Sequence, residues 1–115
     1  MRARLNGIFS DFVDLRAWVP DGGDFSIDVR VNVGMVDVSG GDDFDLNICT
    51  AGWLSRNSPS PLWGRGILVV REFEFSEIES VISSYVDSCE AENWAGIVAK
   101  LCRVMKWEFD DYQSP

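Results

Sequence analysis

The stretch "FSIDVRVNVGM" at residues 25–35 alternates between apolar and polar side chains. Its apolar members are Phe25, Ile27, Val29, Val31 and Val33, and its polar members are Ser26, Asp28, Arg30 and Asn32. Because successive side chains of a β-strand point to opposite faces, the pattern predicts a strand with one buried face and one wet face. The alternation changes parity after Gly34, which predicts a bulge or bend at that residue.

Segments on both sides of this stretch also have the character of strands. We predict strands in "RARLNGIF" (2–9) and "FDLNICT" (44–50), and a central strand in the more continuous apolar run "ILVVREFEF" (67–75). A short helix is predicted in "AGWLSRN" (51–57), whereas "SPSPLWGRG" (58–66) is irregular, with two prolines and two glycines. Strands joined by short turns predict an antiparallel, meandering sheet.

The last third of the chain has helical periodicity. Ser76 and Glu79 have the spacing of a capping box at the start of a first helix, and a second helix is predicted to begin near Asn93. Apolar residues then recur at steps of three and four: Ile78, Val81, Ile82, Tyr85, Val86 and Cys89 in the first helix, and Trp94, Ile97, Val98, Leu101, Cys102 and Met105 in the second. The sequence therefore predicts a single α+β domain over residues 1–115, with two C-terminal helices packed on one face of the sheet.

The composition restricts the partners of the chain. Its 115 residues include 19 acids, 10 bases and no histidine, for a net charge of −9. Such a charge disfavours nucleic acid and anionic membrane as partners and favours a basic protein. The three cysteines have no CxxC spacing, and no apolar run has signal-peptide or membrane-spanning length. Free thiols are typical of a reducing compartment, so we expect a cytoplasmic protein.

Catalytic motifs are missing from the sequence. The lack of histidine excludes Ser–His–Asp and Cys–His catalysis, and there is no GxSxG, Walker or GxGxxG sequence. The segment "GGDDFD" (40–45) resembles part of a calcium loop but lacks the EF-hand spacing. We therefore predict a protein that is not an enzyme, with no catalytic residue, no metal ligand and no cofactor.

The acids are unevenly distributed. Seven of them and no base occur from Glu72 to Ala99, a second cluster lies around Asp42–Asp45, and a third follows Trp107. Charge runs are usually solvated surfaces, but three clusters on a small domain also favour a cationic partner. Trp63 is predicted either to be an exposed anchor or to fold back onto the sheet. The candidate partner-binding residues are Asp42, Asp43, Asp45, Trp63, Glu72, Glu74, Glu77, Glu90, Glu92, Glu108 and Asp110.

Three segments together resemble one family. They are "FDLNICTAGWL" (44–54), "GILVVREFEFSEIESVISSYVDSCEAENWAGIVAKL" (66–101) and "WEFDDY" (107–112), and in this order they resemble the immunity protein 8 family of bacterial polymorphic toxin systems. The family residues are Trp53, Trp94, Trp107, Glu108, Phe109, Asp111 and Tyr112. The resemblance implies an α+β domain that binds and neutralises a cognate toxin domain inside the cell that makes both.

The function expected from this resemblance is a cytoplasmic immunity protein that inhibits by occlusion. Many such toxins are nucleases with positively charged clefts, and an acidic inhibitor can bind there. The alternative is a non-catalytic acidic protein-interaction domain of a larger assembly, and either a monomer or a homodimer is compatible with the sequence. In the last strand predicted, Trp107 and Phe109 share one side for packing, while Glu108 and Asp110 share the other and face solvent or a partner.

Overall fold

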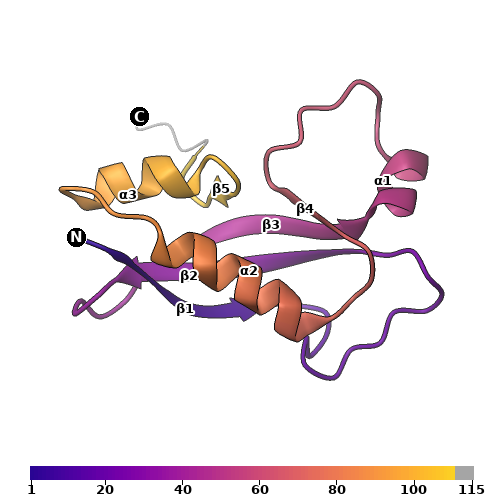
Figure 1. Ribbon diagram of the computed structural model, residues 1–115, viewed down its shortest axis with the longest axis horizontal. Coiled ribbons are helices and arrows are strands. Elements are labelled where there is room, and N and C mark those ends of the chain that lie inside the picture. The colour runs from indigo at the N-terminus through magenta and orange to yellow at the C-terminus, as the bar shows by residue number, and fades with distance from the viewer. Residues whose placement is uncertain (111–115) are drawn as a thin grey trace.

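The computed structural model describes residues 1–110 (Figure 1). Over these residues the chain forms a five-stranded sheet and three helices. In chain order the elements are β1 (Ala3–Phe9), β2 (Ser26–Met35), β3 (Asp42–Thr50), α1 (Ala51–Asn57), β4 (Ile67–Val70), α2 (Phe75–Asp87), α3 (Trp94–Leu101) and β5 (Lys106–Trp107). The predicted α+β class is confirmed, as are the strands in the first half of the chain.

The sheet has the order β1-β2-β3-β4, and β5 also pairs with β3. Every pairing is antiparallel except that of β3 with β4, which is parallel. The far edge of β3 is shared, because residues 47–50 pair with β4 and residues 44–45 pair with β5. Helix α1 and the segment after it form the crossover that lets β4 return in the direction of β3.

The prediction of a central strand over residues 67–75 is wrong. Strand β4 has four residues and pairs only with β3, because the chain leaves the sheet after Val70. Phe73 instead enters an aromatic cluster, with ring centroids 4.8 Å from Trp18 and 5.6 Å from Phe25. Burial of these rings favours the departure from the sheet over a longer strand.

Strand β2 has the predicted two faces. Val29, Val31 and Val33 are buried, whereas Asp28 and Arg30 are exposed. The irregularity predicted at Gly34 lies elsewhere, because Gly34 pairs regularly with Arg4 and the register shifts between Leu5 and Gly7 of β1. A Cβ at Gly34 would lie 2.2 Å from the carbonyl oxygen of Gly40, so this glycine allows the hairpin turn to approach the strand.

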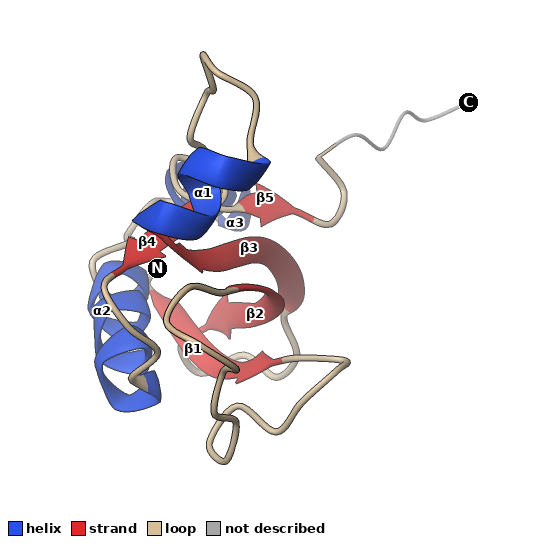
Figure 2. Cartoon of the chain, turned by 90° about the vertical axis from the view of Figure 1, so that its right-hand side faces the viewer, coloured by secondary structure: helices blue, strands red, loops and turns tan. Residues whose placement is uncertain are grey.

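The buried side of the sheet is covered by the two C-terminal helices, as predicted. Helix α2 contributes Ile78, Ile82 and Val86 to the core, and α3 contributes Ile97 and Leu101. These side chains pack in one cluster with the inward residues of β2 and β3. Figure 2 shows α2 against one face of the sheet, while the opposite face has no helix over it. Within residues 1–110, no helix combines the length and apolar character needed to cross a membrane.

The start of α2 differs from the prediction. The helix begins at Phe75 with Glu74 as its N-cap, so Ser76 lies inside the helix and no capping box forms. The Ser76 hydroxyl donates to Oε1 of Glu74 (3.0 Å), and Glu79 accepts from Arg16 (2.8 Å). Val81, predicted on the apolar stripe, is 56% exposed. At α3 the Asn93 side chain accepts from the Gly96 N–H (2.9 Å) as the N-cap, so the helix begins near Asn93, as predicted.

Candidate functional site

The uncovered side of the sheet, which we call the open face, carries the wet residues of four strands. They are Phe9 from β1, Asp28, Arg30 and Asn32 from β2, Asp43, Asp45 and Asn47 from β3, and Lys106 from β5. Each is opposite in parity to a neighbour that packs in the core, such as Ile8 beside Phe9 and Val29 beside Arg30. The alternation in the sequence that places apolar residues on the buried side of the sheet thus also determines which residues occupy the open face.

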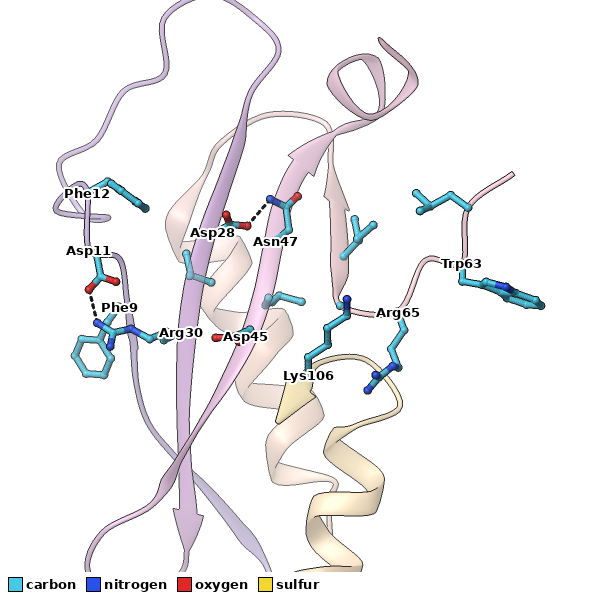
Figure 3. A pocket seen from close by; sticks show the side chains of 15 residues that line it. Phe9, Asp11, Phe12, Asp28, Arg30, Asp45, Asn47, Trp63, Arg65 and Lys106 are labelled. Carbon is cyan, nitrogen blue, oxygen red and sulfur yellow. Dashed lines mark hydrogen bonds and ion pairs between the residues drawn. The ribbon is translucent and has the colours of Figure 1, made fainter. Parts of the chain in front are cut away.

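A concavity of about 490 Å³ lies on the open face (Figure 3). One rim comes from the end of β1 and the residues after it, including Phe9 and Phe12. The opposite rim comes from the segment 62–66, including Trp63. Trp63 is 95% exposed and Phe12 is 79% exposed, so large apolar side chains stand in solvent on both sides of a polar floor. Exposed aromatic side chains around a groove are typical of an interaction site.

The strand register places an alternating row across the floor. Phe9 pairs with Arg30, Arg30 with Asp45, and Asp45 with Lys106. Arg30 turns away from Asp45, because its Nη2 donates to Oδ1 of Asp11 at 2.5 Å. Within residues 1–110 the Asp45 carboxylate accepts no hydrogen bond and forms no ion pair within 4.0 Å. The centre of the row is therefore an unpaired carboxylate.

The neighbouring floor carboxylates have polar partners. Nδ2 of Asn47 donates to Oδ1 of Asp28 at 2.8 Å, and Nδ2 of Asn32 donates to Oδ1 of Asp43 at the same distance. These amides are neutral, so both carboxylates keep their charge uncompensated at close range. Asp28 belongs to the concavity with Asp45, whereas Asp43 lies further along β3.

The Trp63 rim is held by contacts at its C-terminal end. Nη1 of Arg65 donates to the carbonyl oxygens of Cys102 and Met105, both at 3.2 Å, and Nη2 donates to Asp110 at 2.8 Å. The Gly66 N–H donates to the Val104 carbonyl (2.9 Å), and Gly66 has a φ of 83°, which favours glycine. In Figure 3 the Trp63 ring projects outward from this rim. The tryptophan is thus exposed on a segment that is itself anchored.

The opposite rim is ordered by local contacts. The Ser10 hydroxyl accepts from the backbone N–H groups of Phe12 (3.1 Å) and Val13 (3.4 Å). The Phe9 ring lies over Gly7, where an added Cβ would be 2.6 Å from the ring. These contacts position the aromatic side chains of this rim beside the floor (Figure 3).

The predicted partner-binding residues do not share one surface. Asp45 and Trp63 line the concavity, and Asp43 lies on the same face of β3. Glu72, Glu74 and Glu77 surround the start of α2 on the helical side of the sheet. Glu90 and Glu92 precede α3, and Glu108 and Asp110 follow β5, where Asp110 pairs with Arg65. The acids thus surround the molecule.

Asp42 has structural contacts. Its Oδ2 accepts from the indole Nε1–H of Trp94 at 3.1 Å and of Trp107 at 3.0 Å. The carboxylate thereby connects β3 to α3 and to β5 and satisfies two half-buried indoles. We call these three residues the Asp42 clamp.

Trp94 and Trp107 are among the residues of the family resemblance, and the remaining ones differ in how far they are buried. The ring of Phe109 makes an edge contact with that of Trp107 (5.2 Å between centroids) but is 45% exposed, so the predicted packing is partial. The strand predicted there is short, since β5 ends at Trp107. The Trp53 N–H donates to Oγ1 of Thr50, the N-cap of α1. Asp111 and Tyr112 lie outside the described residues.

Several open-face residues were not candidates in the sequence. Phe9, Phe12 and Lys106 line the concavity, but none belongs to an acidic cluster or a periodic pattern. Asp28 and Arg30 did carry a signal, because they occupy the wet positions of residues 25–35. Joining them to segment 62–66 requires the pairing of β2, β3 and β4, which the sequence does not specify.

Catalytic and metal sites require reactive or ligating side chains that lie close together. Within residues 1–110 no group of three or more His, Cys, Asp or Glu side chains has a metal-binding arrangement. The three cysteines are free, and burial raises the pKa of the Cys49 and Cys89 thiols. Those two thiols are therefore protonated near neutral pH, which disfavours nucleophilic reactivity.

The helix-covered inner face and the aromatic-rimmed open face are typical of a small α+β binding domain. The family model of immunity protein 8 matches residues 3–112, and the chain belongs to this family. It is thus an immunity protein of a toxin system, whose role is to bind a cognate toxin. No curated protein and no solved structure matches the chain.

Proposed function

We propose that this protein neutralises a cognate polymorphic toxin domain by covering its functional surface, in the cytoplasm of the cell that makes both. The observation that carries the proposal is the open face, where Trp63 is 95% exposed beside a concavity of about 490 Å³. Tryptophan is among the residues that contribute most to protein–protein binding energy. Inhibition by occlusion requires such a surface and no catalytic group.

We further propose that the toxin is basic and acts on nucleic acid. The net charge of −9 complements a cleft that binds a polyanion. An acidic protein seated on or beside such a cleft excludes the substrate both by its volume and by its charge. The same charge raises the rate at which the two proteins meet.

The test uses the cognate toxin domain, sought among the genes next to the gene for this chain. Expression of the toxin domain alone should stop growth, and coexpression with this chain should restore it and yield a copurifying complex. In vitro, stoichiometric amounts of the chain should abolish cleavage of nucleic acid. Inhibition at substoichiometric amounts would mean that the chain acts as an enzyme on the toxin domain and not by occlusion.

Two results would contradict parts of the proposal. If the purified chain neither binds nor protects, the immunity role assigned to this pair fails. If it protects but the toxin cleaves no nucleic acid, only the nuclease part fails. A binding-deficient variant of the chain is the control for effects of expression alone.

A further inference from the structure

We infer that the open face binds a cationic side chain of the toxin on the carboxylates of Asp28 and Asp45, with Trp63 and Phe12 packing beside it. The inference rests on the proposed function and assigns the contact surface within it. It also separates the acids into contact residues and residues that act at a distance.

The charge of the floor favours a cation. Three cations line the concavity, but Arg30 is paired with Asp11, and Arg65 is paired with Asp110 and two carbonyl oxygens. Asp28 and Asp45 remain, opposed only by Lys106. Within the part of the chain that the structure describes, neither carboxylate has an ion-pair partner within 4.0 Å. With Asp110, which pairs with Arg65 from outside the lining, four acids face three cations, so the floor has an excess of one negative charge.

The positions of the two carboxylates suit a planar cation. Asp28 pairs with Asn47, and Asp45 is two residues before Asn47 on the same face, so the two acids are diagonal neighbours. Diagonal positions in a sheet lie roughly 7–8 Å apart, within reach of one guanidinium or ammonium group. A guanidinium can donate to more than one carboxylate, which makes arginine the best-matched side chain.

The rims supply the apolar part of the surface. Trp63 and Phe12 lie on opposite sides of the floor and are almost fully exposed (Figure 3). The concavity of about 490 Å³ between the rims leaves room for side chains that protrude from a partner. The Trp63 ring projects outward from its rim (Figure 3), so a partner seated on the floor and extending over this rim buries the ring beside the charged contact and excludes water there.

The acids around α2 have a different role. Glu74 is the N-cap of α2 and Glu77 lies in its first turn, and α2 packs on the side of the sheet opposite to the open face (Figure 2). A toxin seated on the open face does not touch them, but their field extends over about 8–10 Å in physiological salt. They therefore act on the encounter and not on the bound complex.

The experiment compares four single variants for binding to the inactivated cognate toxin domain, by surface plasmon resonance. Asp45→Asn and Asp28→Asn should each weaken binding by roughly 30-fold or more, mainly through faster dissociation. Lys106→Met keeps the aliphatic stem and removes the opposing cation, so it should strengthen binding. Asp87→Asn, on the exposed side of α2, removes the same charge as the first two variants and should change dissociation less than twofold.

Whether each variant strengthens or weakens binding shows if the open face binds a cation or an anion. Stronger binding by Asp45→Asn together with weaker binding by Lys106→Met would mean that the face binds an anion, and the inference would be wrong. Unchanged dissociation for all open-face variants, with wild-type protection intact, would also overturn the inference and leave the proposed function standing. If the wild type neither binds nor protects, both the proposed function and the inference about the open face are wrong. Circular dichroism spectra and melting temperatures establish that each variant is folded.

Discussion

Single carboxylates in this protein differ according to what surrounds them. Asp42, Asp43 and Asp45 are close in sequence, yet the first accepts from two indoles, the second from an amide, and the third from no partner within residues 1–110. The sequence predicted all three as partner-binding residues, because an acidic cluster shows where charge lies along the chain but not to which side of the sheet each side chain points. Strand parity separates Asp42 from the other two, since it puts Asp42 on the side of Phe44 and Leu46.

The Asp42 clamp leads to a stability prediction. Asp42→Ala should lower the free energy of unfolding by about 2–4 kcal/mol, because it removes two hydrogen bonds to a charged acceptor and leaves two indoles without a partner. Asp45→Ala on the same strand is the control and should change stability by less than about 0.5 kcal/mol. Urea titration followed by tryptophan fluorescence measures both. Equal effects of the two variants would show that the clamp does not stabilise the fold.

Trp63 leads to a prediction about binding and not about stability. Trp63→Ala should leave the unfolding midpoint unchanged, because the side chain is 95% exposed. The affinity for the toxin domain should fall by about 2 kcal/mol or more if the ring is a hot spot. Calorimetric titration and thermal unfolding provide the two measurements. An unchanged affinity would place the contact surface away from this rim.

Elements with strong periodicity were predictable, and their partners were not. Residues 25–35 fix the position and the buried side of β2, and residues 93–101 fix α3 through its N-cap and apolar spacing. The run "ILVV" has no alternation, so the sequence could not show that β4 pairs in parallel at the edge. Helix α2 starts earlier than its apparent capping box, since burial of Phe75 outweighs the local cap.

The covering helices give a test of the core. Leu101→Ala in α3 should cost about 2–5 kcal/mol of unfolding free energy, because Leu101 is completely buried against the sheet. Val81→Ala in α2 removes apolar atoms from a residue that is 56% exposed and should cost well under 1 kcal/mol. Chemical denaturation of the two variants, each compared with the wild type, gives the difference. Similar losses would mean that α3 does not cover the sheet as described.

The start of α1 gives a prediction of pH dependence. Hydrogen bonds from Arg56 and from Thr50 hold the pKa of Asp24 below its usual value of 3.8. A carboxyl with a lowered pKa in the folded state stabilises the protein above the pKa of the unfolded state, and this contribution is lost as the pH falls through the folded value. Asp24→Asn should therefore be less stable than the wild type near pH 7, with the difference disappearing below pH 3.8. A difference that is constant with pH would exclude the ionised contact.

The whole molecule has a charge of −9 that is spread over both sides of the sheet. In the concavity of the open face Asp28 and Asp45 are opposed by Lys106 and the other charges are paired, so most of the excess charge lies elsewhere, including around α2. A field of this kind changes the rate of encounter more than the lifetime of a complex. We therefore expect the open face to determine the affinity for the toxin and the acids elsewhere, including those around α2, to determine the association rate.

This separation gives a kinetic prediction. The association rate with the toxin domain should fall by about tenfold or more between about 50 and about 500 mM salt, because salt screens the field. A double variant, Glu74→Gln with Glu77→Gln, should slow association at low salt and leave dissociation unchanged. Stopped-flow mixing at both salt concentrations measures these rates. An association rate that does not depend on salt would mean that the acidity serves solubility alone.

The anchored crossover between β3 and β4 has a consequence for how immunity proteins diversify. Residues 58–64 lie between the end of α1 and the Arg65–Gly66 anchor, and none of their side chains belongs to the core cluster. We therefore expect substitutions, and even changes of length, to be tolerated there, because the anchor and the sheet pairing involve other residues. If the Trp63 rim contacts the toxin as we infer, exchange of this one short segment changes the toxin specificity while the rest of the scaffold is inherited.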